Sequence, residues 1–220
     1  NWTGDSDFWE LRTRSSDGAG AATLRGRLLF MCSGYYRYEK GYTPDIPGLE
    51  SFAGQLVHPQ HWPEDLDYRG KKVAVIGSGA TAVTLIPAMA EQTSKITMVQ
   101  RSPTYVVSRP GVDAVARLLN RLLPPRLAYG LLRWRNIRFQ NFIYKRSRKN
   151  PQKMRETFLN LVRKELGEDF DIETHFTPSY NPWDQRVCLV PDSDLFKAIK
   201  SGRADVVTGQ IERITEQGIL

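Results

Sequence analysis

The chain has 220 residues, 40% of them hydrophobic and 25% charged, with a formal net charge of +7. This composition is typical of a globular protein that buries a substantial core, as one large domain or parts of two. No apolar stretch reaches the roughly 18 residues of a membrane span, so we expect neither a span nor a signal peptide. Cys32 and Cys188 lack the spacing of a metal site or a disulfide framework, which favours a cytoplasmic protein without bound metal.

Two short runs with aromatic and apolar residues open the chain. Residues 1–13 form the first run, residues 15–18 read as a turn, and residues 23–31 run back, which predicts a β-hairpin. Such a hairpin has no nearby strand with which to form a larger sheet. Since the chain also starts without Met and stops within a predicted strand pair, we expect it to be a portion of a larger protein.

The strongest motif is a glycine turn between a strand and a helix. The apolar run 73–76 leads into Gly77-Ser78-Gly79-Ala80-Thr81-Ala82, and a helix-compatible segment follows. In a dinucleotide site, the first glycine permits the tight turn and the second lets a pyrophosphate approach the backbone. The small residue at the end lets the helix, whose N-terminal N–H groups face the phosphates, pack closely on the strand.

A second strand, 95–99, ends roughly twenty residues beyond the glycines, where an NAD site presents an acidic residue to the ribose. The chain instead has Arg101 and Ser102 there. A guanidinium can donate a fork of hydrogen bonds to a phosphate, so this position favours the 2′-phosphate of NADP.

Helical patterns then interrupt the strand and helix alternation. Three helices are predicted at 112–123, 126–148 and 152–166, separated by breaks at Pro124-Pro125 and Asn150-Pro151. The strand and helix pattern resumes with a helix at 195–201 and a parallel strand at 205–208. A final strand pair is predicted at 211–215 and 218–220.

The segment 117–155 is strongly basic. Its twelve basic residues are Arg117, Arg121, Arg126, Arg133, Arg135, Arg138, Lys145, Arg146, Arg148, Lys149, Lys153 and Arg155, and it contains no acid. Apolar residues between them make the segment amphipathic. The segment is either a solvated helical face whose apolar side packs on a protein, or a site of peripheral membrane contact. We expect no nucleic-acid partner. The oligomeric state is left open.

A further motif precedes the glycine turn. Phe52, Gly54, His58, Trp62 and Pro63 follow the pattern F-x-G-x-x-x-H-x-x-x-W-P. His61 lies three residues after His58, but without suitably spaced cysteines the pair does not indicate a metal site.

With the glycine turn, this pattern resembles the fingerprint of Baeyer–Villiger and related flavin-containing monooxygenases, over essentially the whole chain. The resemblance implies FAD and NADPH as cofactors, and a flavin peroxide that oxygenates a small-molecule ketone, sulfur or nitrogen centre with O2. The family places the fingerprint between its FAD and NADP domains, where Trp62 either reports cofactor binding or anchors the linker by packing alone.

The resemblance also identifies a candidate catalytic residue. Residues 178–186 resemble the segment that brings the family's active-site arginine to the flavin, which places that role on Arg186. Its permanent charge would stabilise developing anions. Relatives often have Lys-Arg here, with the lysine near the 2′-phosphate, whereas this chain has Gln185, so Arg101 would carry more of the NADP preference.

The implied fold class is α/β: a Rossmann-like, three-layer NADP-binding domain with a helical insertion, plus a β-hairpin fragment of an FAD-binding domain. The expected boundaries are 1–67 for the FAD-domain fragment and linker, 68–111 for the first NADP-domain part, 112–176 for the insertion, and 177–220 for the remainder. The family's FAD-binding G-x-G-x-x-G is missing, so we expect this portion to be inactive alone. The alternative is a non-catalytic NADP-binding or basic surface-binding module; a disulfide reductase would need a C-x-x-C.

Overall fold

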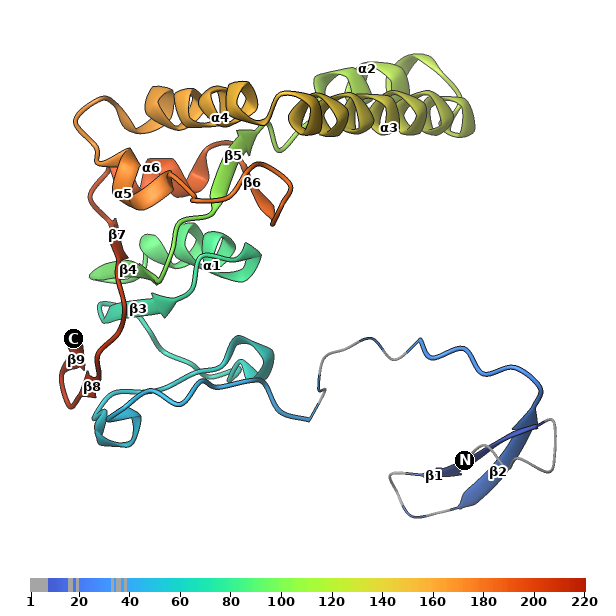
Figure 1. The fold of residues 1–220 in the computed structure, drawn as a ribbon, viewed down its shortest axis with the longest axis horizontal. Coiled ribbons are helices and arrows are strands. Elements are labelled where there is room, and N and C mark those ends of the chain that lie inside the picture. Colours follow the sequence, from blue (N-terminus) through green and yellow to red (C-terminus); the bar gives the residue numbers. More distant parts are fainter. Residues whose placement is uncertain (1–7, 16–17, 19, 33, 35–36, 38) are drawn as a thin grey trace. The chain divides into compact units, whose positions relative to one another are not determined.

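The computed structural model describes residues 8–15, 18, 20–32, 34, 37 and 39–220 (Figure 1). The chain divides into two compact units, Asn1–Thr43 and Pro44–Leu220. Of the sequence-based expectations, the start of the first predicted strand with its Trp2, and the turn residues Ser16 and Asp17, lie outside the described residues.

The first unit contains the predicted hairpin. Strands β1 (Trp9–Arg14) and β2 (Ala21–Gly26) pair antiparallel, with Trp9 opposite Gly26. The predicted extent of the second strand, 23–31, is wrong because β1 begins at Trp9 and offers no partner beyond Gly26. Residues 27–31 are therefore outside the ladder, and Phe30 is 78% exposed.

The second unit is built on a parallel sheet. Strands β3 (Lys72–Ile76), β4 (Lys95–Gln100) and β7 (Ala204–Thr208) pair in the order β3-β4-β7. Helix α1 (Ala80–Ala90) connects β3 to β4. This arrangement confirms the predicted strand–glycine turn–helix–strand unit and the predicted return of a parallel strand at 205–208. The fold is Rossmann-like.

A second parallel pair, β5 (Tyr105–Arg109) and β6 (Val187–Pro191), was not predicted. Between its strands lie α2 (Ala114–Leu122), α3 (Pro125–Lys149), α4 (Pro151–Leu166) and the short α5 (Ile172–Phe176). The three long predicted helices are confirmed to within two residues at each end. Pro125 and Pro151 occupy first turns, where a missing N–H costs no hydrogen bond.

The end of the chain fastens the segment that precedes β3. Helix α6 (Asp194–Lys200) leads into β7, and β8 (Ile214–Thr215) pairs with β9 (Gly218–Ile219). The Ile214 N–H donates to the carbonyl of Pro47 over 2.7 Å, beside the 3₁₀ turn η1 (Leu49–Ser51). A second 3₁₀ turn, η2 (Pro59–His61), follows.

One apolar core holds the sheet and its covering helices together. Ile86 of α1, Ile96 of β4 and Leu195 of α6 are each 0% exposed and belong to the same cluster. Helix α4 contributes Leu159 and Val162 to it, so this part of the insertion belongs to the body of the unit.

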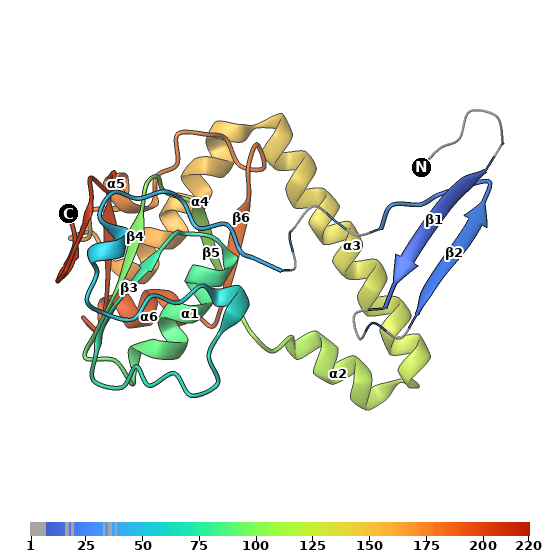
Figure 2. The ribbon, with the colours of Figure 1, turned by 90° about the horizontal axis from the view of Figure 1, so that it is seen from below.

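Helices α2 and α3 differ from α4. Figure 1 shows them projecting from the body of the second unit, and the perpendicular view in Figure 2 agrees. Among the residues of α2 none is buried, and along the 25 residues of α3 only Ala128 and Ser147 are. No helix in the described ranges has both the length and the apolar character needed to cross a membrane.

Candidate functional site

The glycine turn has the backbone geometry that its sequence predicts. Gly77 has a φ of 126°, a region that side chains disfavour, and its N–H donates to the carbonyl of Val99 over 2.8 Å. Gly79 then occupies the N-cap position of α1, where it has no side chain to satisfy the free N–H groups. The first turn of α1, Ala80 to Ala82, therefore offers backbone donors at the carboxyl end of β3.

Arg186 lies directly against this turn. A Cβ placed on Gly79 would come within 2.8 Å of Nη1 of Arg186, so the glycine makes room for the guanidinium. Arg186 immediately precedes β6, and its carbonyl accepts a 3.4 Å hydrogen bond from the hydroxyl of Tyr180. The structure thus brings two predicted site residues together from distant parts of the chain.

A small polar network holds the backbone near Arg186. The Tyr105 hydroxyl donates to the carbonyl of Tyr180 over 2.8 Å, and their rings meet edge to face at 5.4 Å. Burial raises the pKa of Tyr105, whose phenol therefore stays protonated and able to donate at neutral pH. Sequence reasoning did not identify either tyrosine as part of the site's support, because both lie in segments without a regular pattern.

Cys188 provides a second contact between β6 and the glycine turn. Its Sγ lies 4.0 Å from the carbonyl of Ser78, to which it donates. Burial raises the pKa of the Cys188 thiol, and the charge of Arg186 opposes that effect. The neutral thiol is therefore a packing group beside the turn. Sequence reasoning missed this role because it considered cysteine spacing only for metals and disulfides.

The loop after β4 joins the same edge of the sheet. Arg101 and Ser102 are exposed there, immediately after the last residue of the strand. The Ser78 hydroxyl bridges the two loops, 3.5 Å from the Ser102 carbonyl and 3.1 Å from the Thr104 hydroxyl. Ser78 therefore ties the glycine turn to the loop that carries Arg101.

The side-chain amide of the residue before Arg101 is buried and joins three segments of the chain. Gln100 is only 2% exposed, and its Nε2 donates to the His175 carbonyl over 2.8 Å and to the Thr208 hydroxyl over 2.9 Å. The His175 Nδ1 lies 2.8 Å from the same hydroxyl. These bonds fix the ends of β4 and β7, and so the start of the Arg101 loop.

The fingerprint residues have local roles in their own segment. The Phe52 ring covers Gly54, where an added Cβ would lie 2.5 Å from Cζ of the ring. His58 Nδ1 accepts from the Gln60 N–H over 3.2 Å and caps η2. The Trp62 ring meets Tyr68 edge to face at 6.4 Å.

The remaining fingerprint residue, Pro63, accepts the Leu66 N–H at 3.3 Å. Within the described part of the chain, the hydrogen bonds and ring contacts of the fingerprint side chains stay between residues 52 and 68. The structure does not bring them to the glycine turn. Among all the residues that the structure describes, no group of three or more His, Cys, Asp or Glu is placed to hold a metal ion.

Comparison with known proteins shows what the chain is similar to. The model of a family described as flavin-binding monooxygenase-like matches residues 3–169. The FAD-containing monooxygenase EthA of Mycobacterium tuberculosis H37Rv is 50% identical over 220 residues, which are 100% of this chain and 45% of EthA. The probable FAD-binding monooxygenase AlmA of Acinetobacter baylyi is 54% identical over 189 residues, 86% of this chain and 38% of AlmA.

Solved structures share the fold at low sequence identity. The structure of OTEMO with FAD and NADP has a TM-score of 0.69 at 18% identity and is matched over 100% of this chain and 48% of that one. An oxidized steroid monooxygenase bound to NADP has a TM-score of 0.66 at 19% identity, over 95% and 47% of the two chains. The chain thus spans less than half the length of the relatives it matches.

Proposed function

Since the chain belongs to the flavin-binding monooxygenase-like family, we propose that it is the NADP-binding portion of a monooxygenase that uses FAD, NADPH and O2. The observation that carries the proposal is the meeting of Arg186 with Gly79 at the N-terminus of α1. The glycine turn and the permanent positive charge of Arg186 therefore lie at the same edge of the sheet. The names of the relatives and the cofactors of the solved structures support the choice of FAD and NADP.

The residues of the turn suit a pyrophosphate. Gly77 adopts a φ that other residues disfavour, and Gly79 leaves the backbone open where a side chain would fill the space. We assign the pyrophosphate to the backbone N–H groups of Ser78 to Ala82, with Gly77 shaping the turn before them, because a helix N-terminus attracts anions and offers free donors.

Arg101 and Ser102 would hold the 2′-phosphate. Both are exposed at the carboxyl end of β4, the place where a Rossmann-like fold recognises the ribose. The Ser78 bridge and the buried Gln100 fix the loop on which they stand. With Gln185 where relatives often have lysine, Arg101 supplies the main positive charge for this phosphate.

Arg186 would act as the catalytic cation. When bound, NADPH supplies a hydride and FAD supplies the activation of O2. The task of this chain's residues is to position the nicotinamide end of NADP and to keep a fixed positive charge where negative charge develops. The Tyr180 and Tyr105 bonds hold the Arg186 backbone for that purpose, and the Gly79 contact positions the guanidinium.

The proposed organisation has residues 68–111 and 177–220 as the two NADP-domain parts, 112–176 as the insertion, and 1–67 as FAD-domain fragment and linker. The substrate class is a small ketone or a compound with a sulfur or nitrogen centre. The fingerprint residues Phe52, Gly54, His58, Trp62 and Pro63 would act in the linker, and the compartment would be the cytoplasm.

The experiment that tests this function uses the full-length protein. Purified protein should show flavin absorbance, and candidate ketone or thioether substrates should stimulate NADPH oxidation with oxygenated product in equal amount. A protein that binds NADP without any flavin would instead support the alternative of a non-catalytic NADP-binding module.

A further inference from the structure

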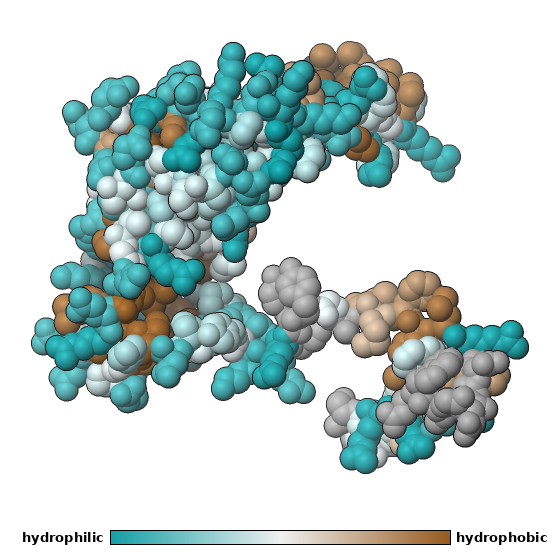
Figure 3. Space-filling model, viewed as in Figure 1, coloured by the Kyte–Doolittle hydropathy of each residue, from teal (hydrophilic) through white to brown (hydrophobic). Residues whose placement is uncertain are grey.

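Helices α2 and α3 form an arm, residues 114–149, whose surface is both apolar and basic. Figure 3 shows apolar side chains gathered at the end of the arm farthest from the sheet. Eleven large apolar side chains of the arm are at least 43% exposed. They are Val115, Leu118, Leu122, Leu127, Tyr129, Leu131, Trp134, Ile137, Phe139, Phe142 and Tyr144. Exposed apolar surface on this scale marks an interaction site.

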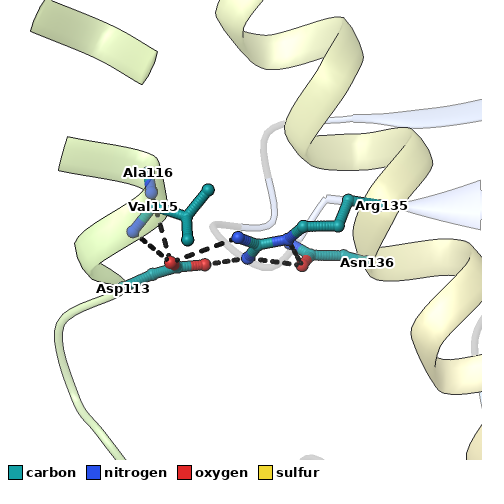
Figure 4. Close-up of polar contacts among 5 residues, drawn as sticks. All are labelled: Asp113, Val115, Ala116, Arg135 and Asn136. Carbon is teal, nitrogen blue, oxygen red and sulfur yellow. Dashed lines mark hydrogen bonds and ion pairs between the residues drawn. The ribbon is translucent and has the colours of Figure 1, made fainter. Parts of the chain in front are cut away.

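Polar contacts fix the two helices of the arm against each other. Asp113 caps α2 by accepting the N–H groups of Val115 and Ala116 at 2.9 and 3.1 Å, and it forms an ion pair with Arg135 of α3 (Figure 4). The Asn136 Oδ1 accepts from Nη2 of Arg135 over 3.0 Å. The Asp113–Arg135 ion pair holds the start of α2 against α3, so the outer faces of the two helices form one surface.

The apolar side chains follow helical stripes. On α2, Val115, Leu118 and Leu122 lie at the i, i+3, i+7 spacing of one face, and Arg117 and Arg121 flank it. On α3, Leu127, Leu131 and Trp134 repeat the i, i+4, i+7 spacing.

Charge decides what can cover this surface. The arm carries ten Lys and Arg residues and no acid, and only Arg135 and Arg148 form ion pairs with acids of the described residues. A second copy of the arm would bring the same uncompensated cations against these, which opposes self-association. Nucleic acid would satisfy the cations but would leave the aliphatic stripes without a partner. An apolar protein surface would cover the stripes but would leave the cations without a partner. An anionic lipid surface satisfies both.

The tryptophan of the arm matches this environment. The Trp134 side chain is 61% exposed, and the Arg138 guanidinium lies 5.1 Å above its ring. An amphipathic ring beside a cation is typical of side chains at the level of lipid headgroups. We propose that the α2–α3 arm docks peripherally on anionic membranes, inserting its apolar stripes between acyl chains while its cations contact phosphate headgroups. This binding is independent of FAD and NADPH.

The test is sedimentation of the full-length protein with phospholipid vesicles. We expect binding to vesicles of equal parts phosphatidylglycerol and phosphatidylcholine, weakening as salt rises, and no binding to phosphatidylcholine alone. Trp134 emission should shift to the blue on binding, and the shift should disappear in Trp134→Phe.

Two double variants separate the contributions. Arg117→Gln with Arg121→Gln should weaken binding to anionic vesicles about 30-fold, from the typical electrostatic contribution of two cations near a charged surface. Leu118→Ser with Leu122→Ser should weaken binding to anionic vesicles by at least tenfold and leave its salt dependence unchanged. All four side chains are exposed, so the variants should keep the thermal unfolding midpoint of the parent protein.

A matched control changes the same charge elsewhere. Lys197→Gln with Lys200→Gln, on the exposed side of α6, should alter vesicle binding less than twofold. Equal loss in this control would overturn the proposal, as would equal binding to both kinds of vesicle. Absence of binding to anionic vesicles also overturns it, and disruption of a dimer by the leucine variant would then show that a second copy covers the arm. The proposal is overturned as well if nucleic acid displaces the vesicles and the leucine variant still binds vesicles normally. NADPH affinity and flavin content should stay unchanged in all these variants.

Discussion

Nη1 of Arg186 and Gly79 are in such close contact that a single added methyl group on the glycine would reach within 2.8 Å of the guanidinium. This contact joins β6 to the N-terminus of α1. It places a fixed positive charge at the edge of the proposed pyrophosphate site, and it makes the size of residue 79 a test of the site's geometry.

Gly79→Ala should weaken NADP binding by about 10- to 100-fold, the loss expected when charge-assisted contacts are displaced. The new Cβ meets the far end of a flexible side chain, so the free energy of unfolding should change by less than about 1 kcal/mol. Titration calorimetry with NADP measures the dissociation constant. Gly130→Ala, where open space surrounds the glycine, is the matched control and should leave it unchanged.

Arg186→Ala should lower the rate of oxygenation by about 10²- to 10³-fold, the usual effect of removing one group that stabilises developing charge. Flavin reduction by NADPH in the full-length protein should be largely retained. Stopped-flow absorbance separates the two half-reactions. Loss of reduction with normal oxygenation would contradict the role, and Arg186→Lys should recover part of the rate because it restores a charge without the planar fork.

Arg101→Gln should reduce affinity for NADPH by about 10- to 100-fold and leave affinity for NADH nearly unchanged, because only NADPH carries the 2′-phosphate. The ratio of the two dissociation constants gives the result. Lys71→Gln, just before the amino end of β3 and so at the other edge of the sheet, should not change that ratio. A parallel loss for both cofactors would show that Arg101 supports the loop instead of recognising the phosphate.

Asp113 predicts how the arm responds to acid. The hydrogen bond from Arg135, followed by that from the Ala116 N–H, holds the pKa of Asp113 below its usual value of 3.8. Its stabilising effect is therefore present above pH 3.8 and is lost as the pH falls through the lower folded-state pKa. Cleavage of the arm by pepsin should accelerate as the pH drops below about 3.8. Asp113→Asn should remove that acceleration, and a variant that keeps it would contradict the assignment.

The core offers a stability test that does not depend on the function. Ile86→Ala should lower the free energy of unfolding by about 2–5 kcal/mol, because Ile86 is 0% exposed and its removal leaves a cavity. Urea unfolding measures the change. Leu122→Ala, at a side chain that is 66% exposed, should change it by less than about 0.5 kcal/mol.

The sequence predicts the parts of the fold that local patterns encode. The run 73–76, the glycine turn and the strand 95–99 follow one another directly, so their periodicity and spacing were enough to predict β3, α1 and β4. Proline positions likewise located the break between α2 and α3 and the break between α3 and α4. Strands β5 and β6 were not predicted, because each strand's partner lies on the other side of the whole insertion.

The same limit applies to the site. Gly77 and Arg101 belong to one strand–helix–strand unit, and their proximity could be predicted from spacing alone. Arg186 was identified only through its resemblance to a family segment. Its contact with Gly79 depends on the β5–β6 pairing, and the contact of Cys188 with Ser78 depends on it too. No local pattern encodes these long-range contacts.

The position of β7 beside β4 has a consequence for synthesis. Gln100 and Thr208, which end the two strands, are separated by 108 residues in the chain. At the usual translation rate of about 5–20 residues per second, β7 leaves the ribosome about 5–20 s after β4. During this interval one edge of β4 has no strand partner, and an open edge invites pairing with other chains. Molecular chaperones that act on nascent chains would therefore meet this protein with its central strand still half paired.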